Sequence, residues 1–251
     1  MKNVLINILG KPTIWRAKNF VYKHLSREFI SRVAFYRQFI CKGDVCFDIG
    51  ANVGNRTAVF LALGAKVVAA EPLDFCREIL QAKFGRRINI VPQGLGAEIG
   101  QKEFYVGSTS TLSTLSTEWI DEVKKQRFPD EEWSPKQMLQ ITTLDELISK
   151  YGKPNFLKID VEGYELEVLK GLSEPIDYIS FEYTIPEQTE ALDACIRYVA
   201  SLGETVFNYS VSESMQLGTD KWMQKQDMLS FVKTEEFRST GFGDVYCKAV
   251  K

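Results

Sequence analysis

One stretch sets the architecture of this chain: Val45-Cys46-Phe47-Asp48-Ile49-Gly50-Ala51-Asn52-Val53-Gly54. It opens with an apolar run typical of a buried strand, and the almost wholly apolar segment from Thr57 to Leu63 predicts a buried helix that begins near Asn55. Gly50 and Gly54 allow the loop between strand and helix to turn sharply and to approach a ligand closely. The pattern is that of a strand, a ligand-binding loop and a helix in an open α/β sheet.

The acidic entry of this loop indicates the kind of ligand. A G-x-G-x-x-G loop cradles a pyrophosphate, whereas here Asp48 opens the loop and Asn52 stands where a glycine is expected. Glu71 follows the loop by about 20 residues, at the end of a second predicted strand that begins at Lys66, where a carboxylate accepts hydrogen bonds from ribose hydroxyls. We therefore predict S-adenosylmethionine, because its amino group and sulfonium are positive and its ribose needs a second carboxylate.

The composition limits the class of protein. The chain has 251 residues and a formal net charge of -2, which fits one large α/β domain with a sizeable core. Near-neutral charge without a long Lys/Arg run argues against a nucleic-acid partner, and no stretch is long and apolar enough to span a bilayer. The 5 cysteines are dispersed and lack C-x-x-C spacing, which is typical of reduced thiols. We expect a cytoplasmic protein with a small-molecule or glycan partner and no membrane span.

Residues 1–41 are predicted to form a helical extension of the main domain at 42–251. Aromatic side chains such as Phe29 recur there at roughly helical spacing among basic residues. We favour a cap packed on the core sheet; the alternative is a lid or a homodimer surface near the ligand. His24, the only histidine, is interpreted as a helix-surface residue, because no nucleophile or carboxylate motif surrounds it.

Further strands follow the first two. The candidates are Ile88–Val91, Glu103–Val106, Asn155–Asp160, Ile179–Tyr183, Thr205–Tyr209 and Val245–Lys248, the last expected to be antiparallel. Right-handed crossovers between parallel strands bring their carboxyl ends to one edge of the sheet, so Asp48, Glu71 and Gln93 should converge there. Gln93 either contacts an adenine ring or belongs to a plain turn.

The region 108–141 breaks the alternation of strands and helices. It contains the hydroxyl-rich loop Ser108–Thr114 and the polar, aromatic stretch Trp119–Met138. Connections of this length are typically functional, so we predict a substrate-specific insertion or lid. A low-complexity linker is less consistent with its tryptophans.

Four motifs together resemble the FkbM family of S-adenosylmethionine-dependent methyltransferases. They are Asp48–Gly54, Glu71-Pro72, Thr143-Leu144-Asp145 and Lys158-Ile159-Asp160-Val161-Glu162-Gly163-Tyr164-Glu165, the last being far more specific than a glycine loop alone. The resemblance, over roughly residues 43–182, implies a Rossmann-like class I methyltransferase fold with a seven-stranded, mostly parallel sheet and helices on both faces. It also implies O-methylation of hydroxyls. The cofactor contacts that it implies are Asp48, Gly50, Asn52, Gly54 and Glu71, with Asp160 facing the methionine end or the acceptor.

The candidate catalytic residues are carboxylates. An alkyl hydroxyl must lose its proton, and the candidate bases are Asp160, Glu162 and Glu182, with Lys158 holding them in place. Glu162 could instead accept backbone N–H bonds at the start of the next helix, and Glu182 could pair with a basic residue. Because no third ligand with persuasive spacing accompanies Asp160 and Glu182, no metal site is predicted.

We therefore predict an O-methyltransferase that acts on a hydroxyl of a sugar, a glycan or a secondary metabolite. Two alternatives from other classes stay open. One is a catalytically inactive cofactor-binding or regulatory protein on the same fold. The other is a nicotinamide-dependent oxidoreductase, which the missing G-x-G-x-x-G pattern disfavours.

Overall fold

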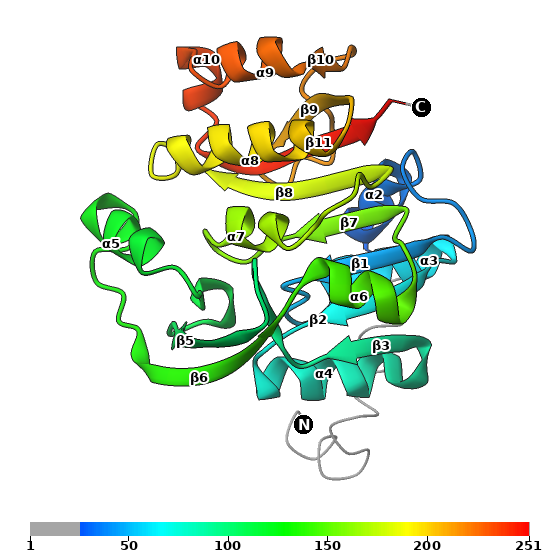
Figure 1. Ribbon diagram of the computed structural model, residues 1–251, viewed down its shortest axis with the longest axis vertical. Helices are drawn as coiled ribbons and strands as arrows, with labels where there is room; N and C mark the ends of the chain where they lie inside the picture. The colour runs from blue at the N-terminus through cyan, green and yellow to red at the C-terminus, as the bar shows by residue number, and fades with distance from the viewer. Residues whose placement is uncertain (1–25, 251) are drawn as a thin grey trace.

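The computed structural model describes residues 26–250, apart from the side chains of Gln126, Pro135 and Lys136. His24 and most of the predicted N-terminal extension lie outside these residues. The main sheet has 8 strands in the order β10-β9-β11-β8-β7-β1-β2-β3 (Figure 1). Their bounds are β1 Val45–Ile49, β2 Lys66–Ala70, β3 Ile88–Val91, β7 Phe156–Ile159, β8 Tyr178–Thr184, β9 Thr205–Val211, β10 Met223–Gln224 and β11 Phe242–Ala249.

The sheet is mostly parallel, as predicted. β3, β2, β1, β7 and β8 pair in parallel, while β11 is antiparallel to both of its neighbours, β8 and β9. The antiparallel late strand expected near Val245 is therefore confirmed. The additional strand β10 has only 2 residues and pairs antiparallel with β9. Such a short strand carries no alternating pattern, so it was not predicted.

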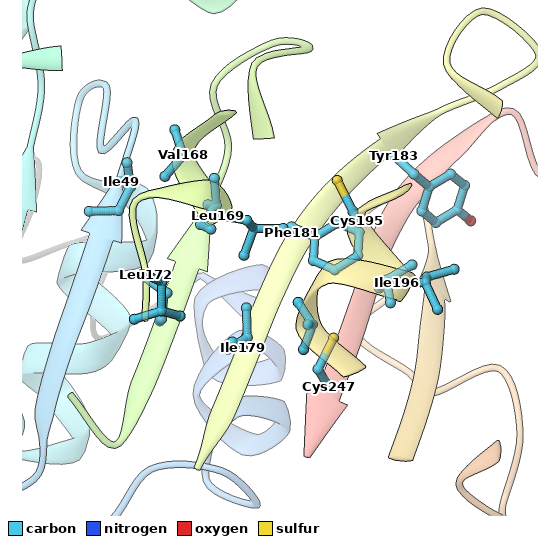
Figure 2. Packing of buried hydrophobic residues seen from close by; sticks show 14 of the residues in the cluster. Ile49, Val168, Leu169, Leu172, Ile179, Phe181, Tyr183, Cys195, Ile196 and Cys247 are labelled. Carbon is cyan, nitrogen blue, oxygen red and sulfur yellow. The ribbon is translucent and has the colours of Figure 1, made fainter. Parts of the chain in front are cut away.

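Helices cover both faces of the sheet. One face packs against α2 Arg27–Tyr36, α3 Asn55–Leu63 and α4 Asp74–Phe84, and the other against α6 Leu144–Tyr151, α7 Glu165–Lys170, α8 Thr189–Leu202, α9 Lys225–Phe231 and α10 Glu235–Arg238. Alternate strand residues enter the two cores: Phe47 and Ile49 face one, and Cys46 faces the other. Figure 2 shows the first core, where Ile49, Leu169, Phe181 and Ile196 gather from β1, α7, β8 and α8. Burial on both faces explains why the strands read as continuous apolar runs.

The described part of the N-terminal segment packs on this sheet. Phe29, Phe35 and Tyr36 of α2 are buried in the core shared with α3. This agrees with the cap interpretation for these residues. The homodimer alternative stays a prediction.

The first turn of α4 places an aromatic side chain in solvent. Leu73 occupies the N-cap position and Phe75 is 66% exposed. The buried stripe of α4 runs through Cys76 and Leu80 instead. Phe75 is rotated by about 100° from Cys76 around the helix, which turns its ring away from the sheet.

The region 108–141 is structured and has a core of its own. It contains η2 Ser110–Leu112, α5 Thr117–Gln126 and most of β6 Ser134–Thr142, which pairs with β5 Gly100–Val106 and β4 Gly94–Leu95 in a second sheet. Trp119, Ile120 and Val123 of α5 are buried together. In Figure 1, α5, β5 and β6 lie on the side toward which β7 and β8 point. The region is no low-complexity linker, and its role as a lid stays a prediction.

In the part of the chain that the structure describes, no helix has the length and apolarity needed to cross a membrane.

Candidate active site

A cavity of about 310 Å³ opens at the carboxyl ends of the parallel strands. Seven of the predicted site residues line it: Gly50, Asn52, Glu71, Gln93, Asp160, Glu162 and Glu182. The order of β2, β1, β7 and β8 in the sheet brings these strand ends together. Asp48, Gly54 and Lys158 do not line the cavity, and each has a different place in the fold.

Gly50 allows the ends of β1 and β7 to close against each other. Its φ is +78°, and a Cβ at this position would lie 1.7 Å from the backbone oxygen of Asp160. Gly54 also has a positive φ, but its missing Cβ would meet the side chains of Leu80 and Phe84 on α4. Gly50 thus shapes the cavity, whereas Gly54 lets α3 pack on α4.

Asp48 lies inside the protein, with only 2% of its surface exposed. Its carboxylate accepts a 2.5 Å hydrogen bond from the Thr57 hydroxyl, which ties β1 to the first turn of α3. Burial raises the pKa of Asp48, although the Thr57 hydrogen bond and the charge of Lys158 act in the opposite direction. The structure therefore gives Asp48 a supporting position behind the cavity, where the sequence predicted a direct contact.

Glu71 joins the glycine loop to the end of β2. One oxygen accepts the Asn52 backbone N–H at 2.7 Å, and the other accepts the N–H of Leu73 at 2.8 Å. Burial raises the pKa of Glu71 even though both donors act to lower it. Each carboxylate oxygen has a further lone pair, so Glu71 can still accept hydrogen bonds from a ligand in the cavity.

Three carboxylates face one another on the opposite side of the cavity. Asp160, Glu162 and Glu182 each place one oxygen so that all three lie within 4.8 Å of one another. Burial raises the pKa of Glu162 and Glu182 well above the ordinary value, and the negative charges of neighbouring carboxylates, Asp160 first, add to this effect. The sequence indicated Glu162 as a candidate base but not as a third carboxylate ligand beside Asp160 and Glu182; its backbone has a positive φ of 52°.

Glu165, and not Glu162, accepts the backbone N–H groups before the next helix. Its carboxylate accepts the N–H groups of Val161 and Gly163 at 3.1 and 3.2 Å, which holds the turn between β7 and α7. Burial raises the pKa of Glu165 to about 7. Among the side chains that the structure describes, neither Glu162 nor Glu182 forms an ion pair, so both keep oxygens for a ligand.

Lys158 stands behind this cluster with 1% of its side chain exposed. Its ammonium group lies 2.6 Å from a carboxylate oxygen of Asp244 and 3.4 Å from one of Asp160. Burial alone would lower the pKa of Lys158, but the charges of Asp160 and Asp244 raise it well above the ordinary value. Sequence reasoning missed Asp244, because nothing local in Gly243-Asp244-Val245 connects it with a residue of β7.

The hydroxyl-rich loop forms another wall of the cavity. The Ser110 hydroxyl donates to the side-chain oxygen of Asn52 at 3.0 Å, and the Thr114 hydroxyl donates to the backbone oxygen of Glu162 at 2.6 Å. Glu213 also lines the cavity and is paired with Arg56 at 2.7 Å. No lysine or arginine is among the described residues of the lining, so the cavity suits a cation.

Comparison with known proteins identifies the family. The model of the Methyltransferase FkbM domain matches residues 48–233. The chain belongs to the FkbM methyltransferase family. Its Rossmann-like class I fold and its methyl donor, S-adenosylmethionine, follow from this membership and agree with the strand order and with the cavity.

One curated relative of this FkbM methyltransferase is the hexuronic acid methyltransferase AglP of Haloferax volcanii. The two are 29% identical over 145 residues, which are 55% of this chain and 54% of the relative. The chain thus spans about half the length of the curated relative it matches.

Two solved structures are similar at low sequence identity. The precorrin-6y C5,15-methyltransferase of Geobacter metallireducens has a TM-score of 0.44 at 10% identity, with 90% of each chain covered. A TehB-like SAM-dependent methyltransferase of Corynebacterium glutamicum has a TM-score of 0.45 at 9% identity, with 94% of this chain and 99% of the other covered.

Proposed function

We propose that this FkbM methyltransferase transfers the methyl group of S-adenosylmethionine to a hydroxyl of a sugar, a glycan or a secondary metabolite. The observation that carries the proposal is the cluster of Asp160, Glu162 and Glu182, which lies in the same cavity as Glu71. One wall offers acceptors for ribose hydroxyls. The opposite wall offers negative charge for a cation and a base for a hydroxyl proton.

The cofactor fits the residues present. S-adenosylmethionine supplies an electrophilic methyl group on a sulfonium. Glu71 would accept hydrogen bonds from the ribose hydroxyls, and Asp160 would face the sulfonium at the methionine end. Gln93 lines the cavity near Glu71 and either contacts the adenine or serves only as a turn. Asn52 is held against both Glu71 and Ser110, so the loop is fixed before any ligand binds.

Glu162 and Glu182 are the candidate bases. Burial and neighbouring carboxylates raise the pKa of both residues, and once ionised a carboxylate with a raised pKa is a stronger base than an ordinary one. A carboxylate oxygen of either residue would take the proton from the acceptor hydroxyl, whose oxygen would gain the methyl group as the bond from the methyl carbon to sulfur breaks and S-adenosylhomocysteine is left.

The acceptor class is supported by the name of the relative AglP, which acts on a hexuronic acid. The acidic lining favours an acceptor that is neutral where it meets the cluster and disfavours nucleic acid, whose phosphates would be repelled. We further propose a cytoplasmic enzyme with its main domain at 42–251, a helical extension at 1–41 and a substrate-specific insertion at 108–141.

The test is a methyl-transfer assay that follows S-adenosylhomocysteine formation with a panel of free sugars, hexuronic acids, oligosaccharides and polyphenols. Transfer to a hydroxyl, identified by mass spectrometry and NMR of the product, supports the proposal. Transfer to nitrogen or carbon would overturn it. Binding of the cofactor without turnover of any acceptor would favour the inactive cofactor-binding alternative.

The same assay should also be run on protein that has been treated with a metal chelator. The three carboxylates could also hold a divalent cation that orients the acceptor, although no metal was predicted from the sequence. We expect turnover to survive dialysis against EDTA. Loss of turnover that Mg²⁺ restores would assign the cluster to a metal-assisted reaction instead.

A further inference from the structure

Asp244 is a buried acid beside the candidate active site, and the family match does not include this residue. It lies near the start of β11, beyond residues 48–233, and 4% of its surface is exposed. Its position in the sheet is opposite Glu182, since the two residues are direct partners in the β8/β11 ladder. Asp244 therefore lies at the edge of the sheet where the cavity opens, although its strand is antiparallel to β8.

The ammonium group of Lys158 lies between two carboxylates, and its distances to them differ. It is 2.6 Å from Asp244 and 3.4 Å from Asp160. Tyr246 donates a long hydrogen bond of 3.4 Å to the second oxygen of Asp244. Asp244 and Lys158 are enclosed in the protein, whereas the Asp160 side chain is 36% exposed and lines the cavity.

We propose that Asp244 is a positioning residue: it holds the Lys158 ammonium in a close ion pair, so that the Asp160 carboxylate keeps its negative charge directed into the cavity. A buried ammonium must have a counter-charge. Without Asp244, the nearest remaining carboxylate is Asp160, and Lys158 would pair with it and neutralise it. The inference rests on the proposed function, because it assigns Asp160 to the sulfonium of the cofactor.

The experiment compares the affinities for S-adenosylmethionine and S-adenosylhomocysteine by calorimetry, which needs no acceptor. The two ligands differ by the methyl group and the sulfonium charge, so the ratio of their affinities reports the negative charge that faces the sulfur. Asp244→Asn should lower this ratio about tenfold, as expected for loss of one nearby charge interaction at a partly exposed site. The matched control is Asp193→Asn, which breaks the Asp193–Arg197 ion pair on α8 and should leave the ratio unchanged.

Two further variants separate positioning from simple support of the fold. Asp160→Asn should lower the ratio as Asp244→Asn does, and the two changes combined should lower it no further than either alone. Lys158→Met with Asp244→Leu removes both buried charges, leaves Asp160 unpaired and should keep the ratio at or above that of the wild type. This double variant carries the test if Asp244→Asn does not fold.

An unchanged ratio in folded Asp244→Asn, or a lowered ratio in the double variant, would overturn the positioning role. Multiplied losses in the combined Asp160 and Asp244 variant would overturn it as well, because they would mean that the two residues act independently. Failure of the wild type to bind either ligand would overturn the proposed function itself. The two failures are therefore distinguishable.

Discussion

Gly50→Ala should destabilise the protein and remove its cofactor site. The new Cβ would lie 1.7 Å from the Asp160 oxygen, and the two atoms must separate by about 1.3 Å to reach the shortest distance of 3.0 Å that real Cβ atoms show. That shift would break the 2.9 Å hydrogen bond from the Asp160 N–H to the Ile49 oxygen, which joins the ends of β7 and β1. The perturbation thus acts on the strand ends that carry the site.

Two terms add up to the expected loss. An L-residue in the left-handed region costs roughly 1–2 kcal/mol, and the lost hydrogen bond costs about 0.5–1.5 kcal/mol. With some strain from the displaced strand end, the free energy of unfolding should fall by about 2–4 kcal/mol. For a chain of this size that corresponds to a Tm lowered by about 4–16 °C.

Thermal unfolding followed by circular dichroism measures the loss of stability, and calorimetry with S-adenosylmethionine measures the affinity for the cofactor. The matched control is Gly241→Ala, since Gly241 has φ +77° but no atom within 4 Å of its missing Cβ. The control should lose only the conformational term of about 1–2 kcal/mol and should keep its affinity for the cofactor. If Gly50→Ala were as stable as Gly241→Ala and bound the cofactor normally, the proposed contact between the strand ends would be refuted.

Three other predictions concern the carboxylates. Glu162 and Glu182 have pKa values well above the ordinary Glu value of about 4.3, so in the free protein they stay protonated at pH values where an ordinary Glu is ionised. Binding of a cation favours their ionised forms, so binding should release protons and become tighter as the pH rises. Calorimetry in two buffers of different ionisation enthalpy measures this proton release. Proton uptake on binding would contradict this sign. Glu71→Gln places an amide against a backbone N–H donor and should weaken cofactor binding about 10- to 100-fold in the same titration, whereas an unchanged affinity would remove Glu71 from the cofactor site. Thr57→Val leaves an oxygen of the buried Asp48 without its donor and should cost about 1–3 kcal/mol in urea unfolding, and a wild-type midpoint would argue against this anchor.

Local patterns predicted most of the fold. Apolar runs marked β1, β2 and β7, since strands buried on both faces leave no polar positions, and an acid at the end of each run marked the edge where a ligand binds. The convergence of Glu71 and Gln93 on the cavity followed from the handedness of the crossovers alone. The Thr143 hydroxyl accepts the N–H of Glu146 at the start of α6, which is the hydrogen bond that a capping-box sequence favours.

Long-range pairings and exact side-chain directions could not be predicted in this way. Lys158 and Asp244 are 86 residues apart in sequence and meet only because β11 inserts beside β8. Glu162 and Glu165 are equivalent acids in one motif, and only the left-handed backbone at Glu162 decides which faces the cavity and which holds the turn. Phe75 shows the same limit, because a rotation of one residue about a helix axis decides between burial and exposure.

The place of β11 between β8 and β9 bears on how the protein is made. On the ribosome, β8 and β9 emerge before β11, so β8 at first has a free edge on the side away from β7. Until β11 enters this gap, the Lys158 ammonium lacks its nearest counter-charge and the β8 end of the cavity is held on one side only. The carboxylates that we assign to the chemistry are thus all synthesised early, but their arrangement is completed by a strand that is synthesised late.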